Sequence, residues 1–300
     1  MTTNHPPRHV VDTIRHDSAR FVVARTLALD DNLSIISLWR ETMSAFTRRD
    51  AIAAGTAVVA GGFAGVAAAV EPTHADPALE AIETRMTAVE TRGTTLKSRQ
   101  MYAVLLAVVT ACGTPAPVAR LVKSALKAGV TPVEVKEILY QCAPYTGLGR
   151  VANVLAEANR ALQEAGVKLP LPDQTQVTDE TRLAKGIEVQ TAIFGDVITK
   201  MHAGVAENEK ALMIGDLSGF CFGDFYTRSG LSVADRELVT FSAIAGLGGC
   251  EPQLKAHTAA CAKEGLTRQN LIDALQIAVP YLGFPRTLNA LAVVKDVIKA

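Results

Sequence analysis

The chain has 300 residues, with 30 basic and 30 acidic side chains and therefore a formal net charge of zero. This balance gives no electrostatic reason to expect a nucleic acid or an anionic membrane as a partner, and we predict neither. Hydrophobic residues make up 49% of the chain and aromatic residues only 5%, so the core should consist mainly of Ala, Leu, Val and Ile. That composition favours packed helices over a β-sandwich.

The N-terminal part predicts export. Residues 1–42 are interpreted as a disordered extension, which a translation start at Met43 would leave out. Residues 43–75 resemble a twin-arginine signal: Arg48-Arg49, an uncharged run over 51–70, and a small-x-small site ending at Ala75. Cleavage there would give a periplasmic or extracellular protein with no stable membrane association. The alternative is an anchor formed by 51–70, since a membrane span needs about 20 residues.

From Pro77 onward, apolar periodicity predicts helices in two sets. The first set comprises 96–112, 115–128, 132–142 and 147–166. The second comprises 179–203, 207–222, 232–247, 252–264, 268–280 and 286–299. Between them, residues 168–176 form a polar, proline-containing connector.

The two sets contain an internal repeat. Pro144-Tyr-x-Gly-x-x-Arg-x-x-Asn-x-Leu-Ala156 recurs 136 residues later, from Pro280 to Ala292. Seven of these 13 positions are identical, whereas average residue usage predicts about one. Gly129 and Thr131 likewise match Gly265 and Thr267. We therefore predict one helical unit that has been duplicated and fused.

The second half carries a longer pattern, which runs from Leu231-Ser-x-x-Asp-Arg-Glu-Leu through Leu247-Gly-Gly, His257 and Gly265-Leu-Thr to Pro-Tyr-x-Gly-Phe-Pro-Arg at 280–286. It resembles the carboxymuconolactone decarboxylase family, which shares a helical fold with alkyl hydroperoxidase D. The resemblance implies an all-α fold of two tandem domains, a degenerate one at 77–168 and one with the candidate site at 178–300. It also implies a homo-oligomer that forms a ring, such as a trimer or hexamer.

Three potentially reactive side chains gather around the double glycine of the second half. Cys250 precedes Glu251-Pro252 and is expected at the positive N-terminal end of a helix. Gln253 and His257 follow at spacings that place them on the same helical face. In the peroxidatic members that the chain resembles, a glutamate, two cysteines and a histidine form the site. Glu237, Cys250 and His257 match that set, while Gln253 replaces the second cysteine.

Three functions remain open. The first is acid–base decarboxylation or related chemistry on a small organic acid or lactone by Glu237 and His257. The second is a thiol-dependent hydroperoxidase, with peroxiredoxin activity at Cys250, a Glu237/His257 relay, and resolution by Cys261 or an external thiol reductant. The third is a non-catalytic oligomeric binding protein.

The remaining candidates are residues that would bind the substrate of the first function. Arg236 or Arg286 could hold a carboxylate and Gln253 could orient it. Tyr281 is a further candidate. Because Arg286 recurs as Arg150 in the other half, a structural role is also open for it.

The first half has none of these reactive groups. Met101, Thr114 and Leu121 stand opposite Glu237, Cys250 and His257, so we interpret that half as a scaffold. The chain has five cysteines but no Cys-x-x-Cys, and the paired spacing of structural zinc sites is absent. We predict no metal and no cofactor.

Overall fold

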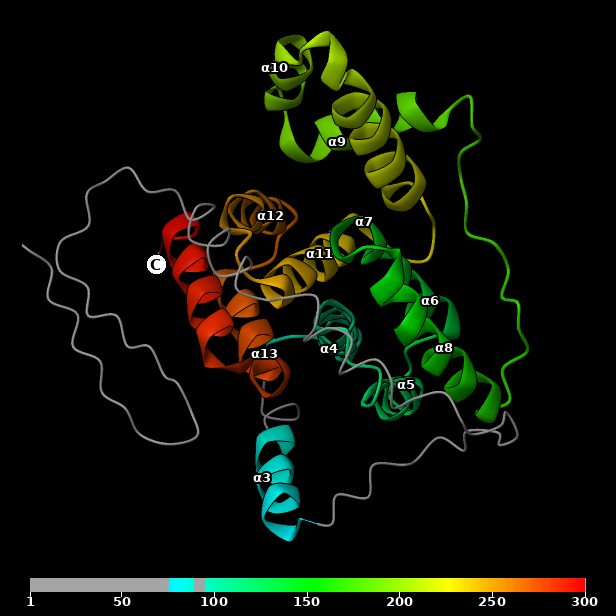
Figure 1. Cartoon of the computed structure of the whole chain (residues 1–300), viewed down its shortest axis with the longest axis vertical. Coiled ribbons are helices and arrows are strands. Elements are labelled where there is room, and N and C mark those ends of the chain that lie inside the picture. The colour runs from blue at the N-terminus through cyan, green and yellow to red at the C-terminus, as the bar shows by residue number, and fades with distance from the viewer. Residues whose placement is uncertain (1–75, 89–94, 300) are drawn as a thin grey trace, which may run out of the picture. The chain divides into compact units, whose positions relative to one another are not determined.

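The computed structural model describes residues 76–88 and 95–299, all of them within the second of two compact units, Pro72–Ala300. The regular elements in these residues are all helical, which confirms the predicted all-α class (Figure 1). The predicted extension at 1–42 and the predicted signal at 43–75 lie outside the described residues.

The elements follow one another in two sets. The first set is α3 (Pro77–Thr87), α4 (Ser98–Cys112), α5 (Val118–Lys127), α6 (Pro132–Gln141), α7 (Ala143–Thr146) and α8 (Leu148–Glu164). The second is α9 (Arg182–Phe194), α10 (Val197–Gly204), η2 (Glu207–Glu209), η3 (Ala211–Tyr226), α11 (Val233–Leu247), α12 (Glu251–Lys263) and α13 (Arg268–Val297).

Two predicted helices differ from the observed ones, one because of a glycine and one because of its hydrogen-bond pattern. The helix predicted at 179–203 is interrupted at Gly195, whose φ of 75° is unfavourable for other residues. The helices predicted at 268–280 and 286–299 both lie in α13, and non-helical Gly283 separates them as predicted. The helix predicted at 207–222 is divided into the short η2 and a π-helical segment, η3, that extends to Tyr226.

The helix order α4–α8 recurs as α11–α13. Both Thr131 and Thr267 begin a helix with a side-chain capping box. Gly147 and Gly283 then have the same left-handed turn, with φ of 82° and 70°, before the helix that ends each set. The same local chemistry therefore builds the same sequence of helices twice.

The main core lies between the two repeats. The long apolar helices α4 and α11 pack against each other, α5 packs on α8, and α12 packs on both α11 and α13.

By length and composition α13 alone, among the described helices, could cross a membrane. Its kink and its buried side chains, such as Leu271 and Ile277, are instead those of a core helix.

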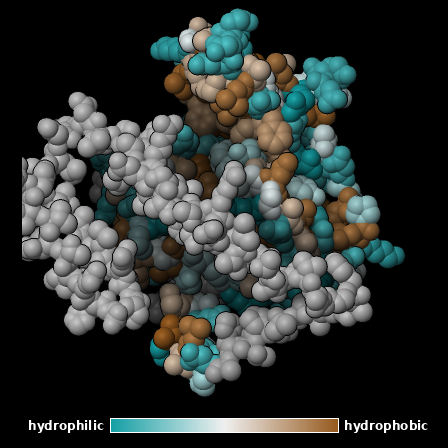
Figure 2. All heavy atoms as spheres, viewed as in Figure 1, coloured by the Kyte–Doolittle hydropathy of each residue, from teal (hydrophilic) through white to brown (hydrophobic). Residues whose placement is uncertain are grey.

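Helix α3 contributes little to this core. None of its side chains is buried, although the helix contacts α13. Leu79, Ile82 and Met86 are 45%, 43% and 37% exposed, and apolar atoms are visible on this helix in Figure 2.

Close backbone contact joins α9 to η3. A Cβ atom on Gly186 would lie 1.8 Å from the carbonyl oxygen of Ser218, and one on Gly223 would lie 2.2 Å from that of Arg182. Only glycine permits the two helices to approach so closely. This contact fixes the helix pair whose ends, Phe194 and Tyr226, reach the candidate site.

We predict that Gly186→Ala lowers the free energy of unfolding by about 3 kcal/mol, because the added methyl group meets backbone atoms that cannot rotate away. Urea denaturation followed by circular dichroism measures the change. Gly149→Ala is the matched control, since its Cβ has no atom within 4 Å; stability there should stay unchanged or rise by about 0.5 kcal/mol. Equal effects of the two substitutions would contradict the close contact.

Candidate active site

A buried carboxylate–imidazole pair forms the centre of the site. Glu237 on α11 is 0% exposed and His257 on α12 is 6% exposed. The Nδ1 atom of His257 lies 2.7 Å from Oε2 of Glu237. Because a carboxylate oxygen accepts, Nδ1 carries the proton and donates it. The Nε2 atom makes no hydrogen bond within the described residues, so it is the nitrogen available for chemistry.

Two glycines bring the two helices together. Gly248 ends α11 and Gly249 follows it, with φ of 70° and 69°, which reverses the chain. Proline at the start of α12 then favours the helical conformation. His257 lies almost two turns into α12, on the side that packs against α11. The sequence predicted this turn and this pairing.

A tyrosine from η3 holds the other oxygen of the glutamate. The hydroxyl of Tyr226 donates to Oε1 of Glu237 at 2.8 Å. Since its only proton is used there, the neighbouring hydroxyls of Thr240 and Tyr145, both at 3.0 Å, must donate to its oxygen. Cys221 then donates from 3.6 Å to the oxygen of Tyr145. Every proton in this cluster has an acceptor.

Burial keeps both tyrosines neutral. It raises the pKa of Tyr226 well above the usual value, and the charge of Glu237 raises it further. Burial also raises the pKa of Tyr145 well above its usual value, and the neighbouring Cys221, Tyr226 and Glu237 raise it further. A neutral Tyr226 therefore remains a hydrogen-bond donor to Glu237 throughout the physiological pH range.

Aromatic rings enclose the imidazole. The rings of Tyr145 and Phe194 meet that of His257 edge to face, at 5.3 and 5.4 Å between centroids. Phe194 is the last residue of α9 and also packs on Phe222 of η3. The pair thus lies where the main core meets a small second cluster built from α9, η3 and α12.

Cys250 makes no hydrogen bond with Glu237 or His257 in the structure. Cys250 caps α12 and is half-buried, and its Sγ donates to the carbonyl of Gly248 at 3.5 Å. It borders a hollow that Arg286 and Asn289, but neither Glu237 nor His257, line. In the described part of the chain no three His, Cys, Asp or Glu side chains gather in a way that could hold a metal ion.

The side chain of Arg236 is buried and makes its hydrogen bonds within the protein. Its guanidinium is 0% exposed and donates to Glu137, to Gln141 at 3.0 Å, and to two backbone carbonyls. Its Nε is buried without a partner. Gln253, by contrast, is exposed on α12. Neither side chain is in hydrogen-bond contact with His257.

Arg286 and Tyr281 also lie apart from the pair. Arg286 packs its stem on Gly248 and donates to the carbonyl of Gly246 at 2.8 Å, which supports the end of α11. The hydroxyl of Tyr281 accepts from Arg120 in the first half at 2.6 Å. The equivalent tyrosine of the first half, Tyr145, is the one that meets His257. Each Pro-Tyr-x-Gly turn therefore reaches across to the other half.

Sequence reasoning missed Tyr145, Tyr226, Phe194 and Cys221 as neighbours of the pair. The repeat did contain a signal for Tyr145. When two halves pack through α4 and α11, the Pro-Tyr-x-Gly turn of one half can lie against the other half. Nothing in the sequence marks the other three, which come from α9 and η3, where the detected repeat has no counterpart.

We predict that iodoacetamide at pH 8 labels Cys250 well before the three buried cysteines. Burial raises the pKa of Cys142 and of Cys221 to about 12, and that of Cys261 well above its usual value. A thiol with a pKa near 12 is ionised to only about 1 part in 10,000 at pH 8, so these side chains react slowly. Peptide mass spectrometry over time measures the order. Labelling of Cys221 as fast as Cys250 would contradict the burial described.

The sequence comparisons agree with this architecture. The model of the carboxymuconolactone decarboxylase family matches residues 76–160 and again residues 216–296, which is consistent with a tandem duplication. A 4-carboxymuconolactone decarboxylase from Acinetobacter baylyi is 28% identical over 123 residues, which cover 41% of this chain and 91% of that protein. With two matched segments that together span more than half of its length, the chain belongs to the carboxymuconolactone decarboxylase family.

Proposed function

We propose that the protein is a lyase-type enzyme that decarboxylates, or moves a proton on, a small organic acid or lactone. The observation that carries the proposal is the buried 2.7 Å bond from His257 Nδ1 to Glu237. Membership of the family and the similarity to the Acinetobacter decarboxylase support this reaction class. The enclosing rings of Tyr145 and Phe194 support a site from which water is largely excluded.

The chemistry requires one proton to be delivered at carbon. In a decarboxylation the bond between the carboxylate and the neighbouring carbon breaks, carbon dioxide leaves, and the electron pair stays on that carbon. The Nε2–H of protonated His257 gives its proton to the carbon, and the neutral imidazole then regains a proton from solvent. The Glu237 carboxylate stabilises the cationic ring and fixes its orientation through Nδ1.

Tyr226 positions the glutamate in this scheme. Its hydroxyl occupies Oε1, which leaves Oε2 for the imidazole. A carboxylate held by two donors cannot rotate away from the histidine. Tyr226 therefore acts through Glu237 rather than on the substrate.

We further propose that the enzyme works outside the cytoplasm as a homo-oligomeric ring. The Arg48-Arg49 motif and the small-x-small site that ends at Ala75 support export. The family resemblance supports the ring.

The first test replaces each member of the pair separately. In His257→Gln and Glu237→Gln, release of carbon dioxide from 4-carboxymuconolactone, the lactone after which the Acinetobacter relative is named, should fall by about 100-fold or more in kcat. Cys250→Ser is the control and should retain turnover, because no bond joins Cys250 to the pair. Loss of turnover in Cys250→Ser, with both variants of the pair active, would contradict the proposal and favour thiol chemistry.

The second test removes one hydroxyl. Tyr226→Phe keeps the ring but loses the donor to Glu237, so we expect about a tenfold loss in kcat and about 1–2 kcal/mol less stability. Tyr102→Phe is the control, because that hydroxyl makes no hydrogen bond among the described residues. Turnover and thermal unfolding measure both effects. A Tyr226→Phe enzyme with unchanged kcat would show that the glutamate needs no such support.

A further inference from the structure

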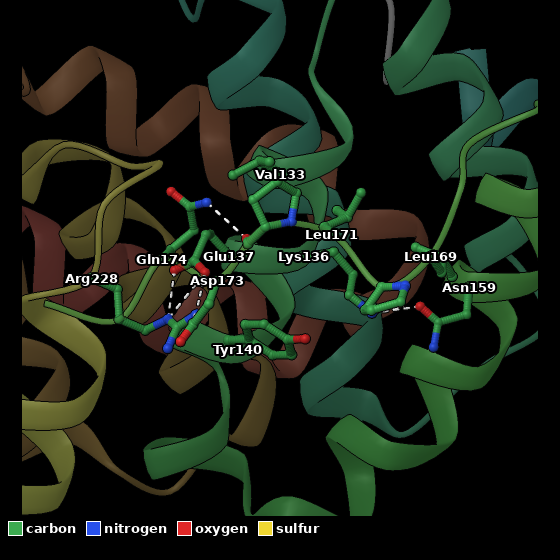
Figure 3. A pocket seen from close by; sticks show the side chains of 12 residues that line it. Val133, Lys136, Glu137, Tyr140, Asn159, Leu169, Leu171, Asp173, Gln174 and Arg228 are labelled. Atoms are coloured by element: carbon green, nitrogen blue, oxygen red, sulfur yellow. Dashed lines mark hydrogen bonds and ion pairs between the residues drawn. The ribbon is translucent and has the colours of Figure 1, made fainter.

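A cavity lined by neither Glu237 nor His257 lies between α6, α8 and the connector that follows α8 (Figure 3). Its volume is about 410 Å³, within the range of sites that bind small molecules. Val133 and the connector residues 169–172 give it apolar walls, while Lys136, Tyr140 and Asn159 give it a polar side. The proposed reaction uses none of these residues.

The carboxylates at this cavity are already neutralised. Arg228 donates to both oxygens of Glu137, and Arg236 donates to the second of them. Asp173, the other acidic residue of the lining, accepts from Arg228 and is otherwise largely exposed. A cation would therefore find no unoccupied buried carboxylate here.

Lys136 is the exception among the charged side chains of the lining. Its ammonium group donates to the amide oxygen of Asn159 and lies 5.6 Å from the centroid of the Tyr140 ring. Both partners are neutral, and the described residues provide no carboxylate for it. Burial lowers its pKa, in keeping with the neutral character of both partners. Figure 3 shows the Tyr140 ring between Lys136 and Arg228.

We propose that this cavity binds a small monocarboxylate with an apolar body. The carboxylate would pair with the ammonium group of Lys136 and accept from the amide nitrogen of Asn159, which makes no other hydrogen bond among the described residues. The body would lie against the apolar walls at 169–172. One uncompensated cation matches a single negative charge, and the apolar walls favour an organic acid over an inorganic ion.

Benzoate is the probe, and benzyl alcohol is its uncharged counterpart. Titrations of the full-length protein followed by saturation-transfer NMR should give saturable binding of benzoate, and about tenfold weaker binding of benzyl alcohol. Lys136→Met should weaken the binding of benzoate by at least about tenfold, because it removes the charge and roughly keeps the length of the side chain. Lys127→Met, which removes an exposed lysine of α5, should leave the affinity unchanged.

Two further variants make each outcome decisive. Leu171→Trp fills the cavity while keeping Lys136, so it should abolish benzoate binding even if Lys136→Met fails to fold. His257→Gln should retain full binding, which separates this cavity from the proposed active site. The proposal is overturned if benzoate does not saturate, if Lys136→Met and Leu171→Trp bind it normally, or if His257→Gln alone abolishes binding.

Discussion

The arrangement of the site depends on one buried carboxylate that must be fully hydrogen-bonded. Glu237 has no exposed surface, and taking a carboxylate out of water costs several kcal/mol unless donors replace the water. His257 of α12 and Tyr226 of η3 provide those donors. Three helices are therefore held at one point by the need to satisfy one side chain.

The same requirement extends into the first half. From Tyr226 the hydrogen bonds continue through Thr240 to Gln141 of α6, and Gln141 accepts from Arg236. Arg236 in turn donates to Glu137. A continuous polar chain thus crosses the otherwise apolar contact between the two repeats. Arg236 is part of this chain, which explains why a side chain next to Glu237 in the sequence does not point to the imidazole.

The two halves share a scaffold but differ in chemistry. Leu121, which stands opposite His257, is fully buried in the core, so that position in the first half supports packing. The first half nevertheless contributes to the site, because its Tyr145 packs on His257 and bonds to Tyr226. A single repeat would lack this tyrosine. We infer that the pairing of the repeats, and not one repeat alone, completes the surroundings of His257.

Much of this could be predicted from the sequence where the signals are local. Apolar periodicity, the capping boxes at Thr131 and Thr267 and the repeated Pro-Tyr-x-Gly turn gave the helices and their order. The double glycine before Cys250 indicated the turn that brings Glu237 to His257. The direction of Arg236 could not be predicted, because it depends on Glu137 and Gln141, about 100 residues earlier in the chain.

The contacts that residues of α9 and η3 make at the site could not be predicted from the sequence, for a related reason. Phe194 reaches the imidazole, and Tyr226 reaches Glu237, because Gly186 and Gly223 let their helices pack with backbones in contact. Such a contact is decided by three-dimensional fit and leaves no periodic pattern. Cys221 becomes a neighbour of Tyr145 through the same packing.

The most direct test of the account is to find which ring nitrogen of His257 carries the proton when the imidazole is neutral. Two-dimensional ¹⁵N–¹H NMR of the histidine rings reports this, with His202, which bonds to Ser218, as the internal comparison. The account predicts a protonated Nδ1 in His257 that is lost or shifted in Glu237→Gln, while the His202 signals stay unchanged. A neutral His257 protonated at Nε2, with the same spectrum in Glu237→Gln, would contradict the buried bond on which the proposed chemistry rests.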